Sequence, residues 1–63
     1  MDDVRREDLV GLTWQEAEEL AQSRGWRTRV LRPGQLVTME HREDRLNLHV
    51  AEDSDVVVDV RQG

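Results

Sequence analysis

The stretch from Arg32 to Leu46 constrains the fold of this 63-residue chain more than any other segment. It opens with a Pro33-Gly34 turn signal and an apolar run at 36–39, then continues as a dense charged run at 40–45. A strand buried on one face alternates apolar and polar residues, and this stretch does not. We therefore predict an exposed connection of about 13 residues, Arg32 to Asp44, which in so small a domain is either disordered or functional.

The length and composition of the chain limit the fold and function classes that are possible for it. A chain of 63 residues forms one domain, 1–63, near the lower limit for folding on a hydrophobic core alone. It leaves no room for a deep catalytic pocket, so we predict no enzyme activity and no cofactor. Cysteine is absent, which excludes disulfides, thiol chemistry and most zinc sites. A net charge of −5 argues against nucleic acid as a partner.

The start of the chain carries no targeting signal that we recognise. It opens Met-Asp-Asp, without a basic or apolar signal region, and no apolar run approaches the length that spans a membrane. We expect a soluble monomer that does not bind membranes, cytoplasmic as written or secreted if the chain is a mature fragment. Residues 1–8 are charged and aperiodic, which predicts a frayed or extended tail.

One helix is predicted from about Thr13 to Arg24. Thr13 and Glu16 have the spacing of a capping box, in which each side chain accepts from the other's backbone amide. An apolar stripe follows at helical spacing, formed by Trp14, Ala17, Leu20 and Ala21. Gly25 then supplies a left-handed stop.

Three strands are predicted, at 26–31, 45–50 and 56–60. The first alternates with Trp26, Thr28 and Val30 on one face. The second places Leu46, Leu48 and Val50 inward and Asn47 and His49 outward. A polar turn at 51–55 precedes the third. The expected class is α+β, one helix packed on a small mixed sheet, with a long exposed loop between two strands that can run parallel.

These features together resemble a known family. The order is a Thr-capped helix containing Glu-Ala, a strand, Pro-Gly-x-x-Val-Thr-Met-Glu, Asp-Arg at the start of the next strand, and a closing Asp-Val-Arg-Gln-Gly. It is similar to the potato inhibitor I family of serine-protease inhibitors, over nearly the whole chain from Leu9 to Gly63. Asp44-Arg45-Leu46-Asn47 also resembles the related microbial elastase-inhibitor branch, whose usual cysteines this chain lacks.

The resemblance implies a protease-binding loop with Met39–Glu40 as the reactive bond. Met39 would be the P1 residue, which enters the primary pocket of the protease. The other residues implied to contact the protease are Leu36 at P4, Val37 at P3 and Thr38 at P2, followed by Glu40, His41 and Arg42. An apolar P1 favours subtilisin-like or chymotrypsin-like serine proteases, and some elastase-like ones, over trypsin-like enzymes.

The resemblance also implies a support beneath that loop. Family members brace the residues beside the reactive bond with two arginines of the following strand. Arg45 fills the first position, Asn47 stands at the second, and Gly63 completes the implied loop support. Asn47 removes a charge from the brace, and its short amide cannot form a charge-assisted bond with Glu40.

Plainer interpretations compete at several positions. Met39 alone is typical of a core residue that fills gaps, and Leu36 or Val37 could anchor the base of the loop. The acidic residues around His41 favour a solvated charged loop over a metal site, because adjacent residues on an extended chain point in opposite directions. For function, the alternatives are a non-inhibitory protein-binding module of the same fold, or a minimal stable scaffold.

Overall fold

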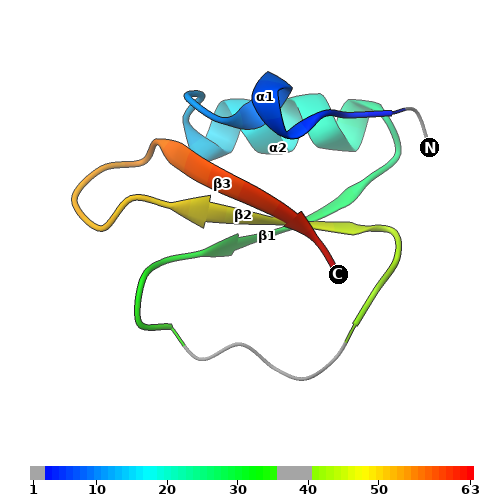
Figure 1. Ribbon diagram of the computed structural model, residues 1–63. Helices are drawn as coiled ribbons and strands as arrows, with labels where there is room; N and C mark the ends of the chain where they lie inside the picture. Colours follow the sequence, from blue (N-terminus) through cyan, green and yellow to red (C-terminus); the bar gives the residue numbers. More distant parts are fainter. Residues whose placement is uncertain (1–2, 36–40) are drawn as a thin grey trace.

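The computed structural model describes residues 3–35 and 41–63. In chain order its elements are α1 (Arg6–Leu9), α2 (Trp14–Ser23), β1 (Arg27–Leu31), β2 (Arg45–Val50) and β3 (Val57–Gln62). The strands form one sheet in the order β1-β2-β3, with β1 and β2 parallel and β2 and β3 antiparallel (Figure 1). The predicted α+β class and the parallel pair flanking the long connection are confirmed.

The capping box predicted for the main helix is present. The amide of Glu16 donates to Thr13 Oγ1 at 3.3 Å, and the Thr13 amide donates to Glu16 Oε1 at 3.3 Å. These bonds satisfy two of the amides that a helix start leaves without a partner in the helix itself. At the other end Gly25 has φ +89, a conformation that costs glycine little. Local chemistry alone therefore defines both ends of α2.

The segment before Leu9 differs from the prediction. We expected a frayed or extended tail up to Asp8, but α1 forms one helical turn there. Its start is held by Asp8, whose Oδ2 accepts from the Arg5 amide at 3.1 Å, and its last residue, Leu9, is fully buried. The tail prediction was wrong for this turn. The burial of Leu9 stabilises the turn, and the hydrophobic periodicity of the sequence does not indicate that burial.

An ion-pair network joins α1 to β3. Arg6 Nε binds Asp59 Oδ1, and Arg61 Nε lies 3.2 Å from Asp59 Oδ2. The hydrogen bond from Arg6, followed by that from Arg61, lowers the pKa of Asp59 to about 2. The turn at α1 is thus attached to the sheet by charge as well as by Leu9.

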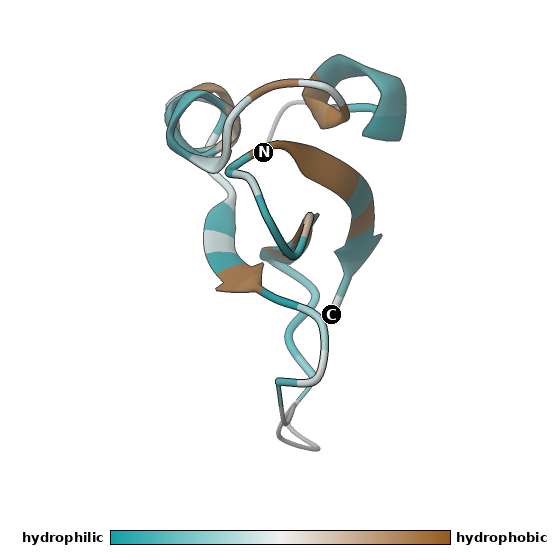
Figure 2. Cartoon of the chain, turned by 90° about the vertical axis from the view of Figure 1, so that its left-hand side faces the viewer, coloured by the Kyte–Doolittle hydropathy of each residue, from teal (hydrophilic) through white to brown (hydrophobic). Residues whose placement is uncertain are grey.

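The core lies between the helices and one face of the sheet. Its buried residues are Leu9, Ala17, Ala21, Leu46, Leu48 and Val57. Both tryptophans, Trp14 and Trp26, are partly buried against it, and so is Val30. Figure 2 shows α1 and α2 on one side of the sheet, with the described ends of the connection between β1 and β2, residues 32–35 and 41–44, on the other. Within the described residues, no helix is both long and apolar enough to cross a membrane.

The second face of the sheet is polar but partly buried. In the register of β1 and β2, Arg27 is opposite Arg45 and Arg29 is opposite Asn47. Asn47 is only 8% exposed and Arg45 only 9%. The prediction that Asn47 points away from the core is correct in direction, since its neighbours Leu46 and Leu48 face the helices. Asn47 is buried nonetheless, in hydrogen-bonding contact with Arg29 and Gly63.

Candidate functional site

The connection between β1 and β2 is fixed at its start by Arg32. A turn follows this residue, in which the Gln35 amide donates to the Arg32 carbonyl at 3.1 Å and Gly34 has φ +78. The Arg32 guanidinium binds the β2–β3 turn, with bonds of 3.1 Å to the Ser54 carbonyl and 2.9 Å to Asp55 Oδ1. One side chain therefore ties the beginning of the connection to a different part of the fold.

The end of the connection is held by two other strands. Gln62 Nε2 of β3 donates to the Glu43 carbonyl at 2.6 Å, and the Arg27 amide of β1 donates to the Asp44 carbonyl at 2.8 Å. Arg27 Nε also lies 3.1 Å from Asp44 Oδ2. Because the bonds come from both edge strands of the sheet, the chain enters β2 in a fixed direction.

Arg45, Asn47 and Gly63 form a buried cluster at that end of the sheet. Arg45 Nε donates to the main-chain oxygen of Gly63 at 3.1 Å, and Asn47 Nδ2 donates to the same oxygen at 2.9 Å. The Gly63 amide donates in turn to the Arg45 carbonyl at 3.0 Å. Among the described residues, no buried side-chain nitrogen or oxygen lacks a hydrogen-bond partner, so this polar cluster is buried without the free-energy cost of unsatisfied groups. The three residues named as loop support do lie together.

Arg29 adds a second cation to the cluster. Its Nε donates to Asn47 Oδ1 at 3.0 Å, so both ends of the Asn47 amide are used. Asn47 carries no charge, but it connects a guanidinium on β1 to the oxygen of Gly63. Arg29 lies directly opposite Asn47 in the register of β1 and β2.

His41 borders this cluster on the side of the connection. A Cβ placed on Gly63 would lie 2.9 Å from His41 Nδ1 and 3.2 Å from His41 Cε1, closer than side chains normally pack. Gly63 also has φ +144, a conformation that favours glycine. A side chain at position 63 would therefore require the exposed His41 imidazole to move aside.

The site residues predicted from sequence fall into three groups. Five of them, Leu36, Val37, Thr38, Met39 and Glu40, lie outside the described residues. His41 and Arg42 are exposed on the return of the connection toward β2. Arg45, Asn47 and Gly63 form the cluster described above.

Sequence reasoning missed the contributions of Arg29 and Gln62. Arg29 and Asn47 both lie on strands that were predicted. Pairing these strands in the parallel register would have placed Arg29 opposite Asn47. Nothing in the sequence pattern indicates that Gln62 reaches the Glu43 carbonyl.

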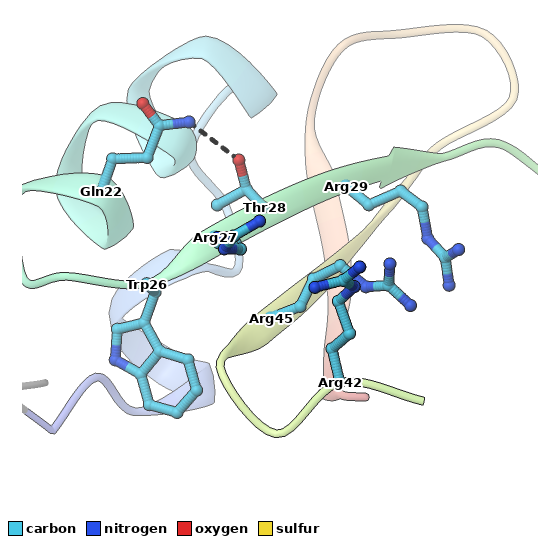
Figure 3. Close-up of a pocket in the computed structure, with 7 residues that line it drawn as sticks. All are labelled: Gln22, Trp26, Arg27, Thr28, Arg29, Arg42 and Arg45. Atoms are coloured by element: carbon cyan, nitrogen blue, oxygen red, sulfur yellow. Dashed lines mark hydrogen bonds between the residues drawn. The ribbon is translucent and has the colours of Figure 1, made fainter. Parts of the chain in front are cut away.

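An arginine-lined hollow lies beside the cluster. It has a volume of about 590 Å³, is open to solvent, and is drawn in Figure 3. The described residues that line it are Gln22, Trp26, Arg27, Thr28, Arg29, Arg42 and Arg45. Figure 3 shows the side chains of Arg29, Arg42 and Arg45 on the same side of β1 and β2.

Comparisons with known proteins agree with this geometry. A solved structure described as that of the elastase inhibitor AFUEI (crystal form II) superposes with a TM-score of 0.69 at 29% sequence identity, covering 92% of this chain and 82% of that one. A comparison with curated proteins found no match. The model of the peptidase inhibitor I78 family matches residues 1–63.

These matches support a protease-inhibitor fold, as the sequence resemblance implied. The family found is not the potato inhibitor I family, and the elastase inhibitor agrees with the second likeness, to the microbial elastase-inhibitor branch. Inhibition rather than catalysis is what such a family implies. This chain belongs to the peptidase inhibitor I78 family.

Proposed function

We propose that this chain is a reversible, substrate-like inhibitor of serine endopeptidases, with Met39–Glu40 as its reactive bond. The observation that carries the proposal is the anchoring of the connection between β1 and β2 at both ends, in a chain of an inhibitor family. Arg32 fixes its start, and Gln62 and Arg27 fix its end. A loop held before binding loses little conformational entropy on association, which raises affinity without new contacts.

Inhibition also requires that the two chain ends of a cleaved loop stay close to each other. If the protease cleaves Met39–Glu40, both new ends remain attached to the same folded domain. The end that begins at Glu40 stays close to the cluster of Arg45, Asn47 and Gly63, since His41 already borders Gly63. Under these conditions the bond can reform at a high effective concentration of its ends. Arg45, Asn47 and Gly63 therefore act as loop support, with Arg29 behind Asn47.

The apolar P1 residue determines the class of target. Met39 suits the open apolar primary pockets of subtilisin-like and chymotrypsin-like enzymes, and Leu36 at P4 favours subtilisin-like enzymes with a second apolar pocket. The elastase inhibitor among the structural neighbours adds elastase-like enzymes to the targets worth testing. The expected interface has the usual size, about 800 Å² per partner.

The test is an inhibition assay against subtilisin, chymotrypsin and elastase, with trypsin as the control for P1. Progress curves should show lasting inhibition of at least one of the first three and none of trypsin. Fast recovery of activity with complete cleavage of the chain would contradict the proposal. Neither inhibition nor cleavage would favour the non-inhibitory binding module instead.

A further inference from the structure

The two ends of the connection between β1 and β2 lie at opposite ends of the sheet. Because these strands are parallel, the connection leaves at the carboxyl end of β1 and returns at the amino end of β2 (Figure 1). The cluster of Arg45, Asn47 and Gly63 lies at the returning end, a strand length away from Arg32. The start of the connection therefore needs an anchor of its own.

That anchor is the turn between β2 and β3, which lies at the same end of the sheet as the start of the connection (Figure 1). The Arg32 guanidinium donates to Asp55 Oδ1 at 2.9 Å and to the Ser54 carbonyl at 3.1 Å. It also reaches the Ala51 carbonyl, at 3.4 Å. The turn is itself attached to α2, because the Trp14 amide donates to the Asp55 carbonyl at 2.8 Å. Arg32 thus links the start of the connection to the main helix by way of this turn.

A second turn carries the position of Arg32 toward the proposed reactive bond. The Arg32 amide donates to Gln35 Oε1 at 2.9 Å, and the Gln35 amide donates back to the Arg32 carbonyl at 3.1 Å. Gly34 has φ +78 in this turn, a conformation that costs glycine little. These bonds fix the direction of the chain up to Gln35, which precedes Met39 by four residues.

Cleavage changes what restrains the start of the connection. When a serine protease cuts Met39–Glu40, the Met39 acyl group passes to the serine oxygen of the enzyme, and the Glu40 amine leaves with a proton from the catalytic histidine. That amine can attack the acyl group again and restore the peptide bond, or water can attack and release a carboxylate. Reversal therefore depends on how closely the fold holds the two new ends.

We propose that Arg32 is a positioning residue for the reversal of cleavage, and that it acts through the turn between β2 and β3. This inference rests on the inhibitory function proposed above. By holding the chain before Met39, Arg32 keeps the new carboxyl end within reach of the Glu40 amine. Loss of the anchor frees the cut chain more than the intact chain, in which the covalent loop still limits the motion of its start. The equilibrium between the two forms then moves toward the cut form.

The chemistry of the anchor favours a guanidinium and sets the size of its effect. The planar donors of an arginine bind a carboxylate and main-chain carbonyls together, whereas the ammonium group of a lysine is a point charge. The Arg32 side chain is 45% exposed and that of Asp55 53%, so water screens their ion pair. Its loss should accordingly shift the equilibrium about two- to five-fold rather than abolish inhibition.

The equilibrium at Met39–Glu40 tests the inference. Intact and cut chains are each incubated with a catalytic amount of subtilisin or elastase until their composition is constant, and mass spectrometry gives the ratio of cut to intact chain. Arg32→Gln should raise this ratio about two- to five-fold over the parent, and Asp55→Asn should raise it by less. The variant carrying both changes should match Arg32→Gln alone, because both remove the same ion pair. Arg5→Gln, which breaks an exposed ion pair at α1, is the matched control and should leave the ratio unchanged.

Two further variants separate positioning from a general loss of stability. Arg32→Lys keeps the charge without the planar donors, so its ratio should fall between those of the parent and Arg32→Gln. Asp8→Ala removes the acceptor for the Arg5 amide at the start of α1, away from both turns. It should lower the stability to urea and leave the ratio unchanged. A merely structural role of Arg32 would instead make the ratio follow stability in both variants.

A measurement on the intact chain is independent of inhibition. NMR order parameters report backbone motion on the picosecond to nanosecond timescale. In Arg32→Gln the order parameters of the Gly34 and Gln35 amides should fall, while those of β2 and of the same amides in Arg5→Gln should stay at the parent values.

The outcomes separate the two proposals. Lasting inhibition with the same ratio of cut to intact chain in Arg32→Gln and Arg5→Gln would overturn the inference and leave the proposed function standing. Unchanged order parameters at Gly34 and Gln35 would overturn the inference whether or not the protein inhibits. Irreversible cleavage of the parent chain would contradict the proposed function, and the reversal assigned to Arg32 with it, while a fall in the order parameters would still support the anchor.

Discussion

Asn47 of β2 donates a hydrogen bond of 2.9 Å from its side-chain amide to the main-chain oxygen of Gly63, and both residues are buried. The same oxygen accepts from Arg45, and the carbonyl of the Asn47 amide accepts from Arg29. Asn47 is therefore linked directly to Arg29 and, through the shared Gly63 oxygen, to Arg45. The cluster joins β1, β2 and Gly63, and we propose that it supports the connection between β1 and β2.

Removing the Asn47 amide should weaken the fold and the support together. We expect Asn47→Ala to lower the free energy of unfolding by about 1–3 kcal/mol, because it removes one acceptor from Arg29 and one of the two side-chain donors to the buried Gly63 oxygen. Urea denaturation measures this change. Gln15→Ala, at an exposed position of α2, is the control and should be nearly neutral. Equal stability of both variants would show that the cluster contributes nothing.

Loss of the Arg45 side chain should change how a protease treats the loop. We expect Arg45→Ala to convert the inhibitor into a slowly cleaved substrate, since one of two donors to the Gly63 oxygen is lost near the return of the loop. Mass spectrometry of samples incubated with subtilisin follows the cleaved fraction with time. Arg5→Ala is the matched control and should be cleaved no faster than the parent chain. Lasting inhibition by Arg45→Ala without cleavage would place the brace elsewhere.

The position of His41, close to where a Cβ on Gly63 would lie, gives a prediction that a double-mutant cycle can test. Gly63→Ala should destabilise the fold by about 1–3 kcal/mol, from backbone strain and from the approach of its Cβ to His41. In a His41→Ala background the cost should fall by about 0.5 kcal/mol or more, because the imidazole is gone. Thermal denaturation of the four proteins gives the coupling. A cost that is identical in both backgrounds would mean that His41 does not press on this end of the chain.

The ion pairs of Asp59 predict a specific loss of stability in acid. Its pKa is lowered to about 2 by Arg6 and then Arg61, against about 3.9 in an unfolded chain. The ionised group stabilises the folded state fully above the unfolded value, and this contribution disappears as the pH falls from about 4 to 2. The parent chain should therefore be more stable than Asp59→Asn at neutral pH, with the difference vanishing near pH 2.

Urea denaturation between pH 2 and 7 measures that difference. Asp53→Asn, in the exposed turn before β3, serves as the control for removing one carboxylate. A gap between the parent and Asp59→Asn that stays constant across this range would contradict the linkage.

The P1 assignment predicts a change of target. Met39→Arg should transfer inhibition toward trypsin-like enzymes, because the buried acidic residue in their primary pocket needs a cationic partner. Inhibition constants against trypsin and subtilisin, measured for the parent chain and the variant, give the change in selectivity. A selectivity that does not move would exclude Met39 as the P1 residue.

Local chemistry explains why α2 and the strands could be predicted. Thr13 and Glu16 define the start of the helix, and Gly25 its end, without help from distant residues. The alternation in 45–50 gave β2 its full length. By contrast, α1 depends on the burial of Leu9, and the burial of Asn47 depends on Gly63 and Arg29, which come from other parts of the chain. Such long-range contacts leave no periodicity in the sequence, and so the helical turn of α1 and the burial of Asn47 could not be predicted from it.

The central claim is that the connection between β1 and β2 binds a protease in the manner of a substrate, and that its cleavage is reversible, so that the protein inhibits the enzyme. The most direct test approaches the equilibrium at Met39–Glu40 from both sides. Intact chain and chain cut at that bond are each incubated with a catalytic amount of subtilisin or elastase, and mass spectrometry follows both forms. We expect both samples to reach the same mixture, with the cut bond partly restored. Complete and irreversible cleavage, or cleavage at another bond, would contradict the account.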